Sequence, residues 1–126
     1  MAEQTAQKLH RSFEDAFNAR DIDGLMALYE PACALVPEPG VIALGQSQVR
    51  EALAGLLALD GMIRLETRDV VEVQELAYLS CAWTLAGTGS DGSALDIGGV
   101  TAEVARRQPD GRWLYVIDLP VAAPRQ

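Results

Sequence analysis

Apolar residues recur at helical spacing in the first half of the chain. Residues 5–19 place them three and four positions apart, which predicts a helix. Asp21 is a typical N-cap for a short second helix, which runs through Tyr29 and ends at Pro31. A third helix is predicted over residues 47–59, with Gly61 as its C-terminal stop.

The segments outside these helices have the spacing of β-strands. Short apolar runs at residues 32–36 and 41–44 flank a Pro-Glu-Pro-Gly turn and predict a small hairpin or a bent edge. Residues 62–74 alternate between apolar and polar side chains, and residues 76–86 are apolar nearly throughout. A glycine-rich turn over residues 87–92 then leads into a further strand.

A long β-hairpin around Pro109-Asp110-Gly111 ends the chain and settles the fold class. Its first strand carries the pair Gly98-Gly99, which predicts strong curvature because glycine permits a bend. Helices first and strands second indicate an α+β fold. We expect residues 1–126 to form one domain, with three N-terminal helices packed on a long, strongly curved, mixed but mainly antiparallel sheet.

Both faces of this hairpin are apolar. Strict alternation places one set of side chains on one face: Thr101, Glu103, Ala105, Leu114, Val116 and Asp118. The opposite face then holds Val100, Ala102, Val104, Trp113, Tyr115 and Ile117. Because the helices can cover only one face, we expect a homodimer through the outer face bearing Trp113, Tyr115 and Ile117.

Composition and charge restrict the partners. The chain is 49% hydrophobic, enough for one core, and its formal charge of −8 argues against nucleic acid or an anionic membrane surface. It has no apolar run long enough to span a membrane and no apolar signal core near Met1. Two reduced, buried thiols, Cys33 and Cys81, suit a cytoplasmic protein.

Two acids in the hairpin are the candidate catalytic residues. Asp118 lies among Leu114, Val116 and Pro120, where loss of water would raise its pKa toward neutrality. Glu103 is expected on the neighbouring strand and on the same face, so the two acids would share one proton at intermediate pH. The alternatives are a solvated or arginine-paired Asp118, and a salt bridge from Glu103 to Arg64 or Arg68.

The other candidate residues are a pocket lining. We expect it to draw on Thr101, Phe13, Phe17, Tyr29, Leu53, Leu57, Trp83 and Val116, with simple core packing as the alternative. His10 is the single histidine and is expected at the surface, so neither a metal site nor a cofactor is expected. No glycine-rich phosphate loop and no Ser-His-Asp relay is evident.

Three segments resemble the nuclear transport factor 2-like superfamily, and in particular the small bacterial proteins of its SnoaL-like branch. These are residues 18–37, the Gly45-Gln-Ser-Gln-Val-Arg-Glu-Ala-Leu segment, and the hairpin from Glu103 to Asp118. The resemblance covers almost the whole chain and implies a cone-shaped fold that dimerises by the back of its sheet. It specifies function weakly, because the superfamily holds many activities.

Ketosteroid isomerase is the relative whose chemistry can be compared residue by residue. The resemblance places its oxyanion-hole tyrosine at Phe13, its general-base aspartate at Pro37 and its protonated aspartate at Glu103. Two of the three roles are therefore missing or displaced. The chain is expected to bind a small hydrophobic ligand, either as an acid–base isomerase, cyclase or lyase of a carbonyl compound, or as a non-catalytic ligand-binding or protein-interaction module.

Overall fold

The computed structural model describes residues 5–88 and 91–124. Within them the element order is α1 (Lys8–Asn18), α2 (Ile22–Met26), β1 (Tyr29–Glu38), β2 (Val41–Leu44), α3 (Gly45–Leu57), β3 (Gly61–Val73), β4 (Leu76–Thr88), β5 (Ala94–Arg107) and β6 (Trp113–Pro124). The α+β prediction is confirmed. Residues 89–90, in the middle of the predicted turn, lie outside the described residues.

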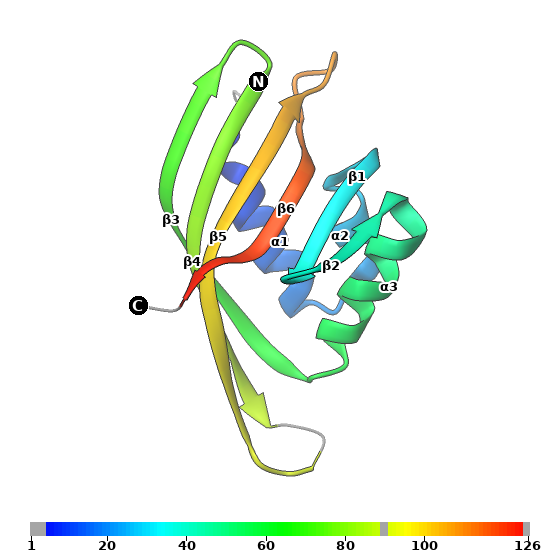
Figure 1. The fold of residues 1–126 in the computed structure, drawn as a ribbon, viewed down its shortest axis with the longest axis vertical. Coiled ribbons are helices and arrows are strands. Elements are labelled where there is room, and N and C mark those ends of the chain that lie inside the picture. The colour runs from blue at the N-terminus through cyan, green and yellow to red at the C-terminus, as the bar shows by residue number, and fades with distance from the viewer. Residues whose placement is uncertain (1–4, 89–90, 125–126) are drawn as a thin grey trace.

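The described strands form one mixed sheet in the order β2-β1-β6-β5-β4-β3. The β1–β6 pair is parallel and the other pairs are antiparallel. The long strands β3 to β6 bend along their length (Figure 1). At Gly98 a Cβ atom would clash with the backbone oxygen of Trp83, so the close approach of β4 and β5 there requires glycine.

The helices cover one side of this sheet (Figure 1). Helix α1 packs against β3, and α3 packs against β1. The Asp21 side chain accepts a hydrogen bond from the backbone N–H of Gly24, which confirms the predicted N-cap of α2. The core between helices and sheet includes Phe17, Leu25, Leu35, Leu53 and Leu85, all fully buried.

Two predicted boundaries are wrong. Tyr29 begins β1 instead of ending a helix, because it pairs with Tyr115 of β6 as a strand residue. The stop of α3 is not made by Gly61: Asp60 takes the left-handed conformation, with φ of 58°, and Gly61 already belongs to β3. Aspartate tolerates this conformation better than most residues, so no glycine is needed at that position.

A β-bulge in β6 changes which side chains face inward. Ala105 pairs with Tyr115 and Val104 pairs with Ile117, so Val116 is an extra residue in β6. Tyr115 and Asp118 therefore both face the helices, although three positions separate them. The placement of Trp113 and Tyr115 on the outer face is wrong, since they are buried under the helices, at 4% and 1% exposure. Strict alternation failed because it does not anticipate a bulge.

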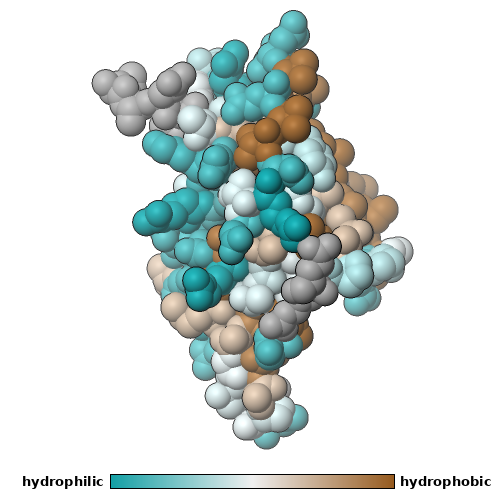
Figure 2. Space-filling view, turned by 90° about the vertical axis from the view of Figure 1, so that its left-hand side faces the viewer, coloured by the Kyte–Doolittle hydropathy of each residue, from teal (hydrophilic) through white to brown (hydrophobic). Residues whose placement is uncertain are grey.

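The outer face of the sheet carries a row of apolar side chains. Val71, Tyr78, Val104 and Ile117 are register partners on four neighbouring strands. All of them except Val104 are exposed. Figure 2 looks at the β3 edge and shows apolar surface gathered along one side of the molecule, opposite a polar side. In the described ranges, no helix is long and apolar enough to cross a membrane.

Candidate functional site

An apolar pocket lies between the inner face of the sheet and the helices. Its lining consists of Phe13, Phe17, Leu35, Leu53, Leu56, Ile63, Leu65, Trp83, Leu85, Thr101, Glu103, Asp118 and Pro120. The cavity has a volume of about 40 Å³. The pocket is therefore narrow and closely packed, with room for a few waters at most.

Asp118 is held by a tyrosine at the floor of this pocket. The hydroxyl of Tyr29 donates to Oδ2 of Asp118 at 2.6 Å, and both residues are buried. Tyr29 comes from the first residue of β1, which runs parallel to β6 and brings its ring beside Tyr115, with 5.2 Å between the ring centroids. Tyr29 thus stands behind Asp118 and does not line the pocket itself.

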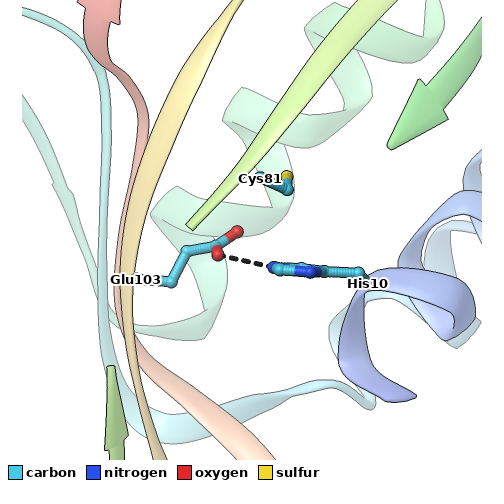
Figure 3. A group of neighbouring side chains, drawn as sticks. All are labelled: His10, Cys81 and Glu103. Atoms are coloured by element: carbon cyan, nitrogen blue, oxygen red, sulfur yellow. Dashed lines mark hydrogen bonds and ion pairs between the residues drawn. The ribbon is translucent and has the colours of Figure 1, made fainter. Parts of the chain in front are cut away.

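Glu103 is held by the single histidine of the chain. Nε2 of His10 lies 2.7 Å from Oε1 of Glu103, and both side chains are only 3% exposed. Nδ1 of His10 lies 2.7 Å from the hydroxyl of Thr67 on β3. The prediction that His10 lies at the surface is wrong: it points from α1 toward the sheet and meets Glu103 there (Figure 3).

The two carboxyl groups act on each other. Glu103 and Asp118 are register partners on β5 and β6, so their side chains leave the sheet side by side. Burial, and then the negative charge of Glu103, raise the pKa of Asp118 to about 8, although the hydrogen bond from Tyr29 lowers it. At neutral pH Asp118 is therefore mainly a neutral acid, which can donate a hydrogen bond. Both acids line the same mainly apolar pocket.

Tyr115 adds a buried hydroxyl without a hydrogen-bond partner among the described residues. Its side chain is 1% exposed, and burial followed by the charges of Glu103 and Asp118 holds its pKa well above the ordinary value. Tyr115 therefore stays protonated next to the acid pair. Few buried polar groups in folded proteins lack a partner, but Tyr115 is not among the described residues that line the pocket.

Thr101 and Trp83 are tied to the protein as well as to the pocket. The Thr101 hydroxyl accepts from the backbone N–H of Cys81 at 2.9 Å. The indole N–H of Trp83 donates to the backbone oxygen of Pro120 at 2.7 Å. These bonds fix both side chains at the pocket wall, so that Glu103 and Asp118 are the ionisable side chains in the described lining.

Most of the predicted lining is at the pocket. Phe13, Phe17, Leu53, Trp83 and Thr101 all contribute to it. Leu57 packs against the core without reaching the pocket, and Leu56, the residue before it, lines the pocket in its place. Val116 is directed elsewhere, since as the bulged residue it lines a shallow groove beside Ala32 and Ile117.

His10, Cys81 and Glu103 offer nitrogen, sulfur and oxygen atoms that lie within 4.8 Å of one another (Figure 3). These are donor types that zinc takes. Here, however, they are engaged with protein groups: His10 and Glu103 bond to each other, and Thr101 donates to the sulfur of Cys81 at 3.5 Å. Burial raises the pKa of Cys81 to about 12, so its thiol stays protonated. A cation would have to break these bonds.

The residues that the sequence analysis missed are His10 and Thr67. One signal was available, because His10 falls between Leu9 and Phe13 on the face that buries α1. Its partner Glu103 is 93 residues away and becomes its neighbour only when α1 packs on the sheet. The spacing of residues along the chain does not reveal such a contact.

Comparison with known proteins agrees with this fold. Residues 9–116 match the family model of the SnoaL-like domain. No curated protein sequence gives a significant match. Three solved structures illustrate the likeness, and at identities below 25% they show the fold alone.

The first is a ketosteroid isomerase-like protein from Erwinia carotovora atroseptica, with a TM-score of 0.79, 18% identity, and coverage of 90% of this chain and 89% of that one. The second is a conserved protein from Planctomyces limnophilus, with a TM-score of 0.79, 16% identity, and coverage of 94% and 93%. The third is an NTF-2 like protein of unknown function from Shewanella oneidensis, with a TM-score of 0.73, 19% identity, and coverage of 90% and 93%.

Proposed function

The chain belongs to the SnoaL-like branch of the nuclear transport factor 2-like superfamily, and we propose that it binds a small, mainly apolar carbonyl compound and moves a proton on it. The chemistry is general acid–base catalysis by its own side chains. The class of reaction is isomerisation, cyclisation or elimination. Because the fold supports many activities, the proposal rests on the site and not on the family.

The observation that carries the proposal is the pair Glu103 and Asp118 at the floor of an apolar pocket. Each acid has its own neutral or basic partner, Tyr29 for Asp118 and His10 for Glu103. The environments separate their roles, since the pKa of Asp118 is raised to about 8. Two acids with divided roles are what acid–base catalysis on a carbonyl compound requires.

In this mechanism Asp118 donates a hydrogen bond to the carbonyl oxygen of the ligand. Glu103 removes a proton from the neighbouring carbon, and the hydrogen bond from the neutral Asp118 stabilises the enolate that forms. Return of the proton to another atom completes an isomerisation, and loss of a leaving group completes an elimination. Tyr29 stabilises Asp118 from behind and plays no direct part with the ligand.

This arrangement differs from that of ketosteroid isomerase as the sequence comparison describes it. Phe13 lines the pocket where that enzyme has its tyrosine, so α1 contributes no hydroxyl group to the described lining of the pocket. The polar groups here come from β5 and β6 at the floor. The proposal is therefore proton transfer by a different set of residues, and steroid isomerisation through the known set is not expected.

The pocket also limits the ligand. No lysine or arginine is among the described residues that line it, and the chain carries a formal charge of −8, so an anionic ligand is disfavoured. The narrow space favours a flat, small ligand unless half-buried side chains such as Phe13 move aside. We propose that the helices and the curved sheet form a cone-shaped enclosure around such a ligand.

The alternative function is ligand binding without catalysis. The mainly apolar lining of the pocket favours it, because apolar side chains bind a ligand by burial alone. The two functions differ in what happens to the ligand. A binding module releases it unchanged, and Asp118 is then a hydrogen-bonding group without a chemical role.

A thermal-shift screen of apolar carbonyl, polyketide and steroid-like compounds tests the proposal on the native protein, Asp118→Asn and the control Asp110→Asn. Asp110 is an exposed carboxylate in the β5–β6 turn. We expect a ligand that stabilises all three proteins and is converted only by the native protein and the control. Conversion by Asp118→Asn at the native rate would exclude catalysis by this acid. Binding without any conversion would support the alternative.

We also propose that two copies associate through the outer face of the sheet, by the row Val71, Tyr78, Val104 and Ile117. This row replaces the one expected from the sequence, of which Ile117 remains. Support comes from the exposure of Val71, Tyr78 and Ile117 in an uncharged row that crosses four strands. The cytoplasmic location inferred from the two thiols also stays a prediction.

A further inference from the structure

The His10 side chain lies between the pocket and a groove on the surface of the protein. On its inner side it bonds to Glu103, which lines the pocket. On its outer side it bonds to Thr67, and both His10 and Thr67 line an open groove between α1 and β3, which we call the outer groove. We propose that Thr67, His10 and Glu103 form a proton path from solvent in the outer groove to the floor of the pocket.

The first support is an unbroken chain of short hydrogen bonds. Both contacts of the imidazole, to the Thr67 hydroxyl and to the Glu103 carboxylate, are 2.7 Å long. A neutral imidazole accepts a proton at one nitrogen and releases another from the second, which no other uncharged side chain does as readily.

The second support is that the described linings of the pocket and the outer groove have almost no residue in common. Among the described residues, Leu65 is the one that lines both, and it carries no polar group. Phe13 and Phe17 stack at a centroid distance of 6.0 Å and form the pocket wall contributed by α1. A proton that passes from the outer groove directly to Glu103, and not through the pocket itself, has the imidazole as its route.

The charged groups at the two ends fit this path. Lys8, Arg11, Glu14 and Glu66 line the outer groove, where water and mobile protons are available. Asp118, Cys81 and Tyr115 stand near Glu103 on the inner side, since the charge of Glu103 acts on each of them. The thiol and the phenol keep their protons, so Asp118 and Glu103 are the groups that exchange one.

The transfer balances in each direction. In the inward direction the Thr67 hydroxyl gives its proton to Nδ1 of His10 and takes one from a groove water, while Nε2 gives its proton to Oε1 of Glu103. The imidazole is neutral before and after, Glu103 has gained one proton, and the groove water has lost one. The reverse sequence carries a proton out and restores the tautomer. The proposal rests on the proposed function only in taking Glu103 as the acid that exchanges protons in the pocket.

Hydrogen–deuterium exchange of the buried carboxylic acid tests the path on the protein alone. The signal is the infrared carbonyl band of the protonated Asp118 side chain, which is identified by its absence from Asp118→Asn. This band is followed after rapid dilution into D2O at a pH about two units below the pKa of Asp118. Thr67→Val and His10→Gln interrupt the path. The glutamine amide can still donate to Glu103 but cannot relay a proton, so folding and relay are separated.

We expect exchange in Thr67→Val and His10→Gln to slow by at least about tenfold, or about 1.4 kcal/mol in the barrier. Thr67→Ser restores the hydroxyl and is expected to exchange at the native rate. Equal rates in all four proteins would overturn the path and show that protons enter through the pocket itself. Slow exchange in both interrupted variants without any ligand conversion would keep the path and reject the proposed catalysis.

Discussion

Glu103 and Asp118 stand directly opposite each other on neighbouring antiparallel strands, and both belong to the wall of one apolar pocket. Two carboxyl groups in that position cannot both ionise cheaply, so the protein holds one of them as a neutral acid. Tyr29 and His10 then give the two acids different environments, because Asp118 is hydrogen-bonded to Tyr29 and Glu103 is hydrogen-bonded to His10. Four of the expectations below follow from this arrangement and the last from the outer face of the sheet.

Replacing Asp118 by asparagine is expected to change how stability depends on pH. The pKa of Asp118 rises from 3.8 to about 8 on folding, so the native state holds a proton that the unfolded chain loses between these pH values. The free energy of unfolding contributed by Asp118 therefore falls as pH rises from about 4 to about 8 and stays low above it. Asp118→Asn removes this fall, which denaturant titrations at several pH values will measure.

At pH 9 we expect Asp118→Asn to be more stable than the native protein by about 4 kcal/mol, because each pH unit between pH 5 and the pKa of about 8 lowers the stability of the native protein by about 1.4 kcal/mol. At pH 5 the two proteins are expected to be similar, because the asparagine oxygen can still accept from Tyr29. Asp110→Asn serves as the exposed control. Parallel stability curves for native protein and Asp118→Asn would contradict the raised pKa.

Tyr29→Phe is expected to raise the pKa of Asp118 further. The hydroxyl of Tyr29 is the one contact that lowers this pKa, and phenylalanine removes it while keeping the ring. Infrared titration of the carboxylic band measures the change. An unchanged or lower pKa would show that the bond at 2.6 Å does not stabilise the ionised acid.

Tyr115→Phe is the matched control for Tyr29→Phe. It removes a second buried hydroxyl from the same pair of rings, but one without a hydrogen-bond partner among the described side chains. We expect little change in the pKa of Asp118 and a free energy of unfolding that is unchanged or higher by up to about 1 kcal/mol. A marked loss of stability would mean that this hydroxyl is bonded in solution.

His10→Ala is expected to destabilise the fold by about 2–4 kcal/mol, because it leaves Glu103 buried without its partner. Adding Glu103→Gln should recover part of this loss, since the amide carries no charge. Arg11→Ala is the control on the same helix: its ion pair with Asp15 is 3.8 Å long and exposed, so less than about 0.5 kcal/mol is expected. Chemical denaturation compares the variants, and equal losses for His10→Ala and Arg11→Ala would contradict the buried pair.

Tyr78→Glu is expected to convert a dimer to a monomer by placing a charge in the apolar row of the outer face. Light scattering coupled to gel filtration measures the mass. Ile42→Glu is the control, since Ile42 is exposed on the edge strand β2, away from the row. A monomeric native protein, or a dimer insensitive to Tyr78→Glu, would place association elsewhere or exclude it.

The fold could be predicted largely from local patterns. Helical spacing located α1 and α3, Asp21 identified the start of α2, and Pro109-Asp110-Gly111 identified the last hairpin. The errors arose where local pattern and tertiary structure differ. Tyr29 fits a helix by its spacing but is drawn into β1 by pairing with β6, which is distant in sequence.

The candidate site was predictable only in part. Asp118 and Glu103 were identifiable as acids among apolar neighbours on paired strands. Their partners were not, because Tyr29 and His10 reach them from 89 and 93 residues away. Such contacts depend on how β1 pairs with β6 and on how α1 packs on the sheet, and a single sequence contains no local signal for them.

The extra residue at Val116 has a consequence for how relatives should be compared. Tyr115 and Asp118 share the inner face only because β6 gains one position between them. A relative with the same tyrosine and an acid three positions later, but with a regular strand, would direct that acid away from its pocket. The spacing within this strand, together with the identity of the acid, therefore separates relatives that share this pocket floor from those that only share the residues.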